Sequence, residues 1–399
     1  MRVLQVIASM DPAAGGTSQG IRNSIPELEK LGYQNEVVCL DSPDAAFIKK
    51  DLFKLHAIGP SKGPWQYSPN LLPWLSANLV NFDVVIINGL WLYHGYAVMK
   101  QIGSEKRKGN NKTRVYIMPH GMLDPYFQKA GSRKLKAIRN WVYWKAIEGK
   151  IINTADGILF TCESEKVLAR QTFTPYKPKR ELNVGYGIQT PPPFDSTFLT
   201  AFYSKCKGAE NQRYLLFLSR IHEKKGVDLL LNAYKAVLKT KTGNQEKNQI
   251  PKLVIAGPDI ESAYGKEILK IVADDPSLER QVFFPGMLSG DAKWGAFYGC
   301  EAFVLPSHQE NFGIAVVEAL ACSKPVLISD KVNIWNEISA ENAGLVAEDT
   351  IEGTQKLLTD FFALSTEEKS TMGLNAFNCF KNKFTIEAAA LNFSEAINN

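Results

Sequence analysis

The sequence has no long hydrophobic run and no cluster of cysteine or histidine. No stretch approaches the roughly 18 unbroken apolar residues that a membrane-spanning helix needs. The first apolar run, 3–8, is too short for a secretory signal, so we expect a cytoplasmic protein. The six cysteines are scattered and form no Cys-x-x-Cys pair, which favours a reducing compartment and argues against structural zinc.

The charge of this 399-residue chain is divided unevenly. The length suggests two domains of roughly 200 residues each. Residues 1–190 hold 25 Lys and Arg against 15 Asp and Glu, a balance of +10, whereas 191–399 hold 21 against 26, a balance of −5. We therefore expect an anionic partner for the first half, such as a lipid surface or a phosphorylated acceptor. Nucleic acid ranks last, because no nucleic-acid module is recognisable.

Strand-like and helix-like runs alternate along the chain, which is typical of parallel sheets covered by helices on both faces. Three consecutive prolines, 191–193, exclude helix and most strand pairing and predict a linker. The sequence thus predicts an α/β protein with two doubly wound, Rossmann-like domains, 1–190 and 191–383, followed by a helical segment, 384–399. The expected strands are 3–9, 36–40, 83–88, 114–119, 157–162, 182–185, 214–219, 252–257, 282–285, 302–306, 326–329 and 344–347.

The segment 306–319 (Pro-Ser-His-Gln-Glu-Asn-Phe-Gly-Ile-Ala-Val-Val-Glu-Ala) is the most informative. It follows an apolar strand and is expected to begin a helix at Gly313. Glu310 and Glu318 lie on either side of the turn 312–314, whose free N–H groups can hold an anion at a helix N-terminus. A nucleotide sugar, with its diphosphate between a sugar and a ribose, fits that layout. Taken alone, the two carboxylates are weak evidence for a site, because carboxylates on helices usually face solvent.

A second loop, after the expected strand 214–219, carries Arg220, Lys224, Lys225 and Gly226. Fixed cations stabilise the negative charge that develops on a departing diphosphate. Arginine offers phosphate a planar fork and lysine a compact point charge. An ordinary basic loop before a helix is the simpler alternative, and Lys224 fits the description of a solvated neighbour.

Two segments of the first half could also face a ligand. Gly15 and Gly16 precede a helix, as in phosphate-binding loops, but also as in many tight turns. His120 ends a strand and could project into a cleft or serve a structural role.

The segment 129–150 carries seven Lys or Arg and one Glu among aromatic and aliphatic residues, which suits an anionic membrane surface. A helix packed by its aromatic face, with a solvated basic face, is the alternative.

In order and spacing, these segments resemble the retaining glycosyltransferases of family 4, of the polysaccharide-biosynthesis type. The resemblance rests on 15–16, 120–125 (His-Gly-Met-Leu-Asp-Pro), 220–226 and 310–318, and it covers nearly the whole chain. It implies the GT-B fold, in which two Rossmann-like domains face a cleft and the final helix crosses back to the first domain. Ser323 departs from the family pattern, which commonly has glycine there.

The resemblance also implies residue roles. Glu310 would bind the hydroxyls of the donor sugar, and Arg220 and Lys225 the diphosphate. His120 would position the sugar as an electrostatic partner. These four residues are the expected catalytic set. The expected donor-binding set is Gly15, Gly16, Gly286, Met287, Leu288, Asn311, Phe312, Gly313, Ile314 and Glu318, with Glu318 on the ribose and 286–288 beside the base.

We therefore predict a retaining hexosyltransferase that moves a sugar from a nucleotide-diphosphate donor to an acceptor hydroxyl in cell-surface or envelope polysaccharide synthesis. UDP-glucose is the first candidate donor, ahead of UDP-galactose and GDP-mannose. No metal or other cofactor is expected, because no Asp-x-Asp occurs. The expected partners are the nucleotide sugar and a saccharide or lipid-linked saccharide, with contact to the inner face of an anionic membrane left open. A nucleotide-sugar epimerase and a non-catalytic sugar-binding protein are the alternatives.

Overall fold

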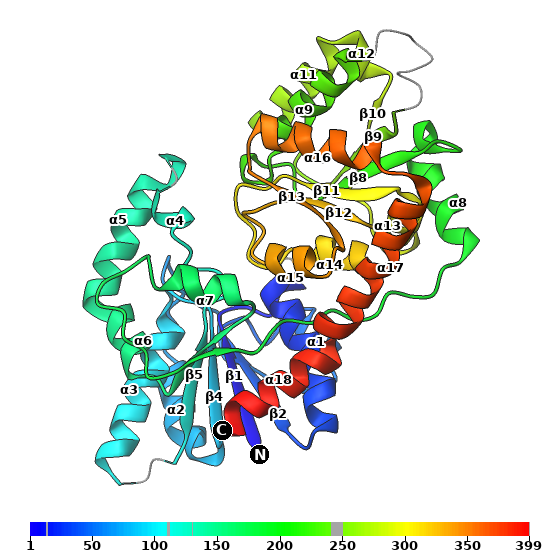
Figure 1. Cartoon of the computed structure of the whole chain (residues 1–399). Helices are drawn as coiled ribbons and strands as arrows, with labels where there is room; N and C mark the ends of the chain where they lie inside the picture. The colour runs from blue at the N-terminus through cyan, green and yellow to red at the C-terminus, as the bar shows by residue number, and fades with distance from the viewer. Residues whose placement is uncertain (13–14, 110–111, 130, 241–249, 399) are drawn as a thin grey trace. The chain divides into compact units, whose positions relative to one another are not determined.

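The chain forms two compact units (Figure 1). A computed structural model describes all 399 residues except 13–14, 110–111, 130, 241–249 and 399. Unit 1 comprises Met1–Gly187 and Ile386–Asn399, and unit 2 comprises Ile188–Thr385. The backbone therefore leaves unit 1 after Gly187 and returns to it at Ile386.

Unit 1 is built on a seven-stranded sheet with the order β3-β2-β1-β4-β5-β6-β7, in which all neighbouring strands are parallel. Its strands are β1 Arg2–Ile7, β2 Gln34–Cys39, β3 Lys54–Ala57, β4 Val84–Asn88, β5 Arg114–Met118, β6 Gly157–Phe160 and β7 Glu181–Asn183. Its helices are α1 Gly16–Lys30, η2 Ile48–Lys50, α2 Leu71–Asn78, η3 Leu79–Asn81, α3 Tyr93–Arg107, α4 Tyr126–Lys129, η4 Gly131–Arg133, α5 Lys134–Tyr143, the π-helix η5 Trp144–Glu148, α6 Gly149–Thr154, α7 Glu163–Ala169 and α18 Ile386–Asn398.

Unit 2 is built on a six-stranded parallel sheet with the order β10-β9-β8-β11-β12-β13. Its strands are β8 Tyr214–Leu218, β9 Lys252–Ala256, β10 Val282–Gly286, β11 Ala302–Leu305, β12 Val326–Ser329 and β13 Gly344–Ala347. Its helices are α8 Ser196–Lys205, η6 Lys207–Ala209, η7 Glu223–Lys225, α9 Val227–Lys239, α11 Ala263–Ala273, α12 Pro276–Glu279, α13 Gly290–Gly299, α14 Ile314–Ala321, α15 Trp335–Ala340, α16 Ile351–Ala363 and α17 Thr366–Lys383.

Both sheets are doubly wound, as the sequence predicted, and the fold class is confirmed. The twelve expected strands are all present, with ends that differ by at most two residues. The strand β3 was missed. It lies at the sheet edge and is half-exposed, so Lys-Leu-His-Ala has no apolar run to reveal it. In the part of the chain that the structure describes, no helix is long and apolar enough to cross a membrane.

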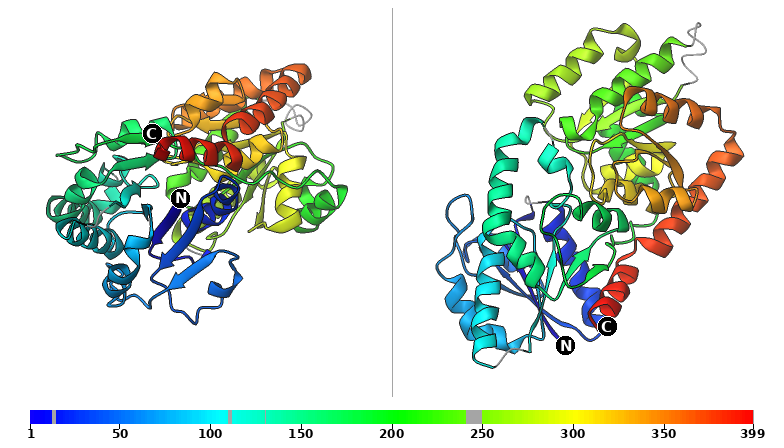
Figure 2. Two further views of the ribbon diagram at one scale, coloured as in Figure 1. Left: turned by 90° about the horizontal axis from the view of Figure 1, so that it is seen from below. Right: turned by 60° about the vertical axis from the view of Figure 1, so that its left-hand side comes forward.

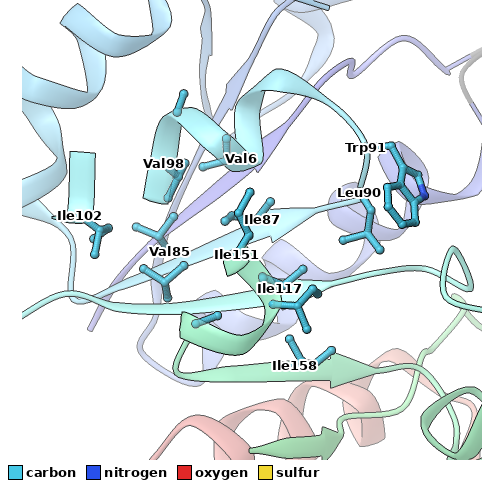
Figure 3. Close-up of a cluster of buried hydrophobic side chains, with 14 of the residues drawn as sticks. Val6, Val85, Ile87, Leu90, Trp91, Val98, Ile102, Ile117, Ile151 and Ile158 are labelled. Carbon is cyan, nitrogen blue, oxygen red and sulfur yellow. The ribbon is translucent and has the colours of Figure 1, made fainter. Parts of the chain in front are cut away.

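Helices cover both faces of the sheet in unit 1, which is why its central strands are apolar throughout. On one face, Val98 and Ile102 of α3 and Ile151 of α6 pack over the sheet near Val85 and Ile87 (Figure 3). This core extends to Trp91, just beyond the end of β4. It thereby holds the loop that follows the strand.

The last helix, α18, completes the other face of unit 1, where it lies beside α1 (Figures 1 and 2). Phe393 and Ile397 of α18 are buried against Val3, Tyr33 and Tyr116. The hydroxyl groups of Tyr33 and Ser394 are 2.7 Å apart and hydrogen-bonded. The last helix of the chain is thus part of the same core as the first strand, although nearly 400 residues separate them in sequence.

Strand order reverses at one point in each sheet, between β1 and β4 in unit 1 and between β8 and β11 in unit 2. In open parallel sheets, ligands bind outside the carboxyl ends of the strands at such a point, because the following loops diverge there. The loops after these four strands are therefore where a site is expected.

Candidate functional site

In unit 2, the loops after β8 and β11 join through a buried ion pair. The Lys225 ammonium contacts Oε2 of Glu310, and both side chains are largely buried, with 9% and 19% of their surface exposed. Sequence reasoning placed both residues in one site, and the structure brings them together. The contact joins the loops that flank the point of strand reversal.

Close packing of the two loops depends on Gly226. This residue has a φ of +67°, and a Cβ atom added there would lie 2.2 Å from the carbonyl oxygen of Pro306. The backbone N–H of His308 and the hydroxyl of Ser307 each donate to the carbonyl oxygen of Lys224 at 2.8 Å. Glycine at position 226 therefore permits the approach that lets Lys225 reach Glu310.

The ion pair keeps Glu310 charged. Burial raises the pKa of this carboxyl, but the neighbouring Lys225 and Lys224 ammonium groups outweigh burial and hold the pKa below its usual value. Lys224 is further held by a 2.8 Å hydrogen bond to Oε1 of Gln309, so it is not simply a solvated neighbour. Arg220 is exposed, and within the described residues it has no hydrogen-bond or ion-pair partner. Its guanidinium is thus available to an anion.

The backbone around Glu310 is fixed on its other side by the loop after β12. The N–H of Glu310 donates to the carbonyl oxygen of Lys331, and the N–H of Asn333 donates to that of Glu310, both at 2.9 Å. The side-chain amide of Asn333 also donates to Oδ1 of Asn311 at 3.4 Å. Phe312 is buried and meets Phe384 edge-on, with ring centroids 5.7 Å apart. These contacts orient the turn that precedes α14.

Helix α14 begins at Ile314, one residue later than expected, with Gly313 as its N-cap. Gly313 has a φ of +78°, which favours glycine, and no side chain caps the helix. The first N–H groups of a helix lack intrahelical acceptors and carry partial positive charge. The turn next to Glu310 therefore offers an anion the N–H groups that the sequence suggested.

Glu318, on α14, pairs with a residue that sequence reasoning missed. Lys293 Nζ lies 2.8 Å from Oε1 of Glu318 and 4.0 Å from the ring centroid of Trp294. Lys293 is the second residue after Asp291 in helix α13, and nothing in its local sequence distinguishes it from an ordinary surface lysine. The carboxylate keeps a second oxygen with which to accept hydrogen bonds from hydroxyl groups.

The expected base-binding segment lies at the end of β10. Gly286 has a φ of +76°, and its carbonyl oxygen accepts a 2.9 Å hydrogen bond from the N–H of Gly257. Met287 is 71% exposed, whereas Leu288 is buried. Gly257 in turn packs closely against Ser219: a Cβ atom added to Gly257 would lie only 1.8 Å from the Ser219 carbonyl oxygen. The strand exits from β8, β9 and β10 are thus packed side by side.

In unit 1, His120 follows β5 and has a φ of +51°. Its Nε2 lies 3.0 Å from Oδ1 of Asn88. Because the Asn88 amide nitrogen donates to Gln5 at 2.9 Å, Oδ1 must be the acceptor, so His120 carries its proton on Nε2. Burial lowers the pKa of His120 to about 4. At neutral pH the ring is therefore uncharged, and Nδ1 is left as an acceptor.

A small cavity of about 70 Å³ adjoins His120 and is lined by Gln5, Gly20, Asn88 and Tyr186 among others. Gly15 has a φ of +102° and is the N-cap of α1, in which Gly16 is the first residue. The Tyr186 hydroxyl donates to the Gly16 carbonyl oxygen at 2.8 Å. The glycine pair thus belongs to the same part of unit 1 as His120.

Sequence reasoning missed Gln5, Asn88 and Tyr186 as neighbours of His120. Asn88 could have been recognised from the sequence, because it is a polar residue at the end of the otherwise apolar strand Val-Val-Ile-Ile-Asn. Nothing in the local sequence marks Gln5 or Tyr186 as a neighbour of His120. That His120, Gly15 and Gly16 act with the residues of unit 2 stays a prediction. In the ranges described, no group of three or more His, Cys, Asp or Glu side chains is placed to hold a metal ion.

The family models and the relatives that this chain matches agree with one another. Residues 14–180 match the family model described as Glycosyltransferase Family 4, and residues 203–378 match that described as Glycosyl transferases group 1. One relative is a glycosyltransferase of Methanocaldococcus jannaschii, 27% identical over 136 residues, which are 34% of this chain and 32% of the relative. Another is the alpha-monoglucosyldiacylglycerol synthase of Streptococcus pneumoniae, 28% identical over 198 residues, 48% of this chain and 42% of that protein. These matches span about a third to two fifths of the length of the relatives.

A solved structure extends the likeness to the whole fold. HepE of Anabaena, in complex with UDP and glucose, is similar with a TM-score of 0.72 and 16% identity, over 100% of this chain and 99% of that one. The two family models together cover most of the chain, one on each unit. By its family models and its fold, this chain belongs to the glycosyltransferases of the GT-B fold.

Proposed function

We propose that the protein transfers a hexose, with retention of anomeric configuration, from a UDP-sugar to an acceptor hydroxyl in cell-surface or envelope polysaccharide synthesis. The observation that carries this proposal is the pairing of Lys225 and Glu310 at the strand reversal of unit 2, beside the N-terminus of α14. UDP-glucose is the preferred donor, since a similar structure holds UDP and glucose. UDP-galactose and GDP-mannose follow.

The residues of unit 2 supply what a departing diphosphate needs. Its leaving oxygens gain negative charge, which fixed positive groups stabilise. Arg220 and the first N–H groups of α14 provide such groups, and Lys225 adds a cation whose charge Glu310 partly offsets. Glu310 and Glu318 bind hydroxyl groups of the sugar and ribose. The reaction proposed here uses no metal or other cofactor.

His120 acts in this proposal as a neutral positioning group. With its pKa lowered to about 4 by burial, it offers a hydroxyl group an acceptor at Nδ1 instead of a positive charge. It is thus suited to orient a sugar and unsuited to offset phosphate charge. The acceptor is a saccharide or lipid-linked saccharide, and the enzyme works in the cytoplasm, at the inner face of an anionic membrane. The name of the relative from Streptococcus pneumoniae specifies a glucosylated diacylglycerol, which supports an acceptor that contains a lipid.

Release of UDP from UDP-glucose tests the reaction. We expect Arg220→Gln and Lys225→Met each to reduce release by at least about 100-fold, the loss typical for removal of one group that stabilises transition-state charge. Lys356→Met is the matched control. Lys356 also lies in unit 2 but pairs with Asp360 on the exposed surface of α16, so its loss should leave release unchanged. Undiminished release by both site variants would refute the assignment.

The donor and the competing functions are separated by two further measurements. Thermal unfolding is compared across UDP-glucose, UDP-galactose and GDP-mannose, because a ligand that binds the native state raises the midpoint by mass action. An epimerase would interconvert UDP-glucose and UDP-galactose without releasing UDP, and a sugar-binding protein would do neither. Nuclear magnetic resonance of the product then reads the anomeric configuration.

A further inference from the structure

One surface of unit 1 exposes large apolar side chains that the proposed reaction does not use. It lies on the continuous helical segment formed by α5, η5 and α6. Leu135, Ile138 and Val142 are 85%, 62% and 53% exposed, and Trp141 beside them is 55% exposed. Their spacing of three and four residues places them on one face of α5. The opposite face, with Ala137, Asn140 and Tyr143, is buried.

The same segment carries positive charge with no exposed acid to balance it. Residues 129–150 contain seven Lys or Arg, and the single acid is Glu148. Glu148 is only 1% exposed, and its Oε2 accepts a 3.1 Å hydrogen bond from the N–H of Trp91 inside the core. Burial raises the pKa of Glu148 to about 7. The exposed charges of this segment are therefore all positive.

A groove continues the apolar face of α5 along the same helical segment. It lies between α3 and the helices η5 and α6, and its volume is about 410 Å³. Its lining includes Lys100, Arg107 and Lys150 and no carboxylate. Ala146 and Lys150 of the lining follow Val142 at intervals of four residues, so groove and apolar face form one strip. Figure 2 (right) shows this segment running along the side of unit 1 that faces the viewer.

The charge decides between the possible occupants. A second copy of the chain bound through the same strip would bring cations against cations, which opposes association. An anionic bilayer offers the opposite charge, an apolar interior for Leu135 and Ile138, and an interface that suits Trp141. The Lys145 ammonium lies 5.7 Å from the Trp141 ring centroid, so a cation stands directly beside an aromatic ring of the kind found at membrane interfaces.

We propose that α5 and the adjoining groove form a docking surface for an anionic lipid bilayer. The apolar face of α5 enters the headgroup region, and Lys100, Arg107 and Lys150 receive lipid phosphates in the groove. This rests on the membrane contact in the proposed function and specifies the surface that makes it. Such docking holds unit 1 at the bilayer without a membrane-spanning segment.

The test measures co-sedimentation of the full-length protein with vesicles in the absence of nucleotide sugar. Vesicles of phosphatidylcholine alone are compared with vesicles containing about 30% phosphatidylglycerol, at about 0.1 M and about 0.5 M salt. We expect binding only to the anionic vesicles and weaker binding at high salt. The triple variant Leu135→Ser, Ile138→Ser, Val142→Ser should bind at least about tenfold more weakly, because it loses most of the inserted apolar surface.

Two further variants make the result specific. Leu374→Ser with Leu391→Ser removes two apolar side chains of similar exposure, 64% and 52%, outside the docking surface, and should bind like the wild type. Lys100→Gln with Lys150→Gln should weaken binding by about tenfold or more, since each cation near an anionic surface contributes to affinity. Unchanged circular dichroism and thermal unfolding confirm that the variants fold.

Three outcomes would overturn the inference: no binding of the wild type to anionic vesicles, equal binding by the triple variant, or wild-type dimers in solution that the triple variant loses. The proposed reaction is judged separately by UDP release without vesicles. UDP release without vesicle binding would support the proposed reaction and refute the docking surface. Vesicle binding without UDP release would support the docking surface and refute the reaction.

Discussion

Replacement of Gly226 by alanine should destabilise unit 2 and loosen the Lys225–Glu310 contact. The left-handed conformation at position 226 costs an alanine about 1–2 kcal/mol. The added Cβ would also lie 2.2 Å from the carbonyl oxygen of Pro306, a backbone atom that cannot rotate away. Overpacking of this kind costs about 1–3 kcal/mol. The two effects together predict a loss of about 2–5 kcal/mol in the free energy of unfolding.

Gly286→Ala is the matched control. Gly286 has a similar φ of +76°, but a Cβ atom there meets no atom within 4 Å. Its replacement should therefore cost only the conformational part, about 1–2 kcal/mol. The difference between the two variants, about 1–3 kcal/mol, isolates the close approach of the two loops.

Urea unfolding followed by circular dichroism measures the loss, and hydrogen exchange of peptides from β8 and β11 localises it. The variant should also weaken the ion pair and so raise the pKa of Glu310 toward its usual range. Equal losses in Gly226→Ala and Gly286→Ala would refute the reasoning. They would mean that the loops do not need glycine to meet.

Three further predictions concern stability. The pKa of Glu310 is below its unfolded value, so the contribution of the ion pair to stability is fully present above about pH 4.5 and falls as the pH drops through the lowered pKa. Glu310→Gln should cost about 3 kcal/mol at pH 7 in urea unfolding, because it leaves Lys225 buried and unpaired, and the cost should shrink steadily on acidification below about pH 4.5. Glu148 has a raised pKa of about 7, so it destabilises the fold increasingly from pH 4.5 to 7; Glu148→Gln should therefore gain about 3 kcal/mol over the wild type at pH 8 and little at pH 4, as measured by urea unfolding. Ser323 has a φ of +59°, and Ser323→Gly should raise the unfolding free energy by about 1 kcal/mol in calorimetry, whereas a loss would show that the serine side chain contributes more than its strain costs.

Much of the fold could be predicted, because buried parallel strands are continuous apolar runs that end in glycine, proline or polar residues. Val84–Asn88 and Ala302–Leu305 are of this kind. Edge strands carry less information, as β3 shows. The π-helix Trp144–Glu148 was also beyond prediction, since π-helices are rare and the local sequence does not distinguish one from an α-helix.

For the candidate site, the sequence indicated the loops and not their contacts. Residues that stand at fixed spacing after a strand, such as Glu310 and Lys225, could be named because position after a parallel strand determines the sheet edge where they lie. Residues that reach the site from another element could not. Lys293 contacts Glu318 from α13, and Gln5 contacts Asn88 from the middle of β1, because tertiary packing brings them there.

The position of α18 has a consequence for synthesis of the chain. Phe393 and Ile397 complete a core that begins with Val3, yet they emerge from the ribosome after all of unit 2. Unit 1 therefore cannot follow the usual order in which the first domain folds before the next is made. Until residue 386 has been translated, the apolar surface around Val3 and Tyr116 lacks its final cover. Apolar surface left exposed in this way makes a nascent chain prone to aggregation.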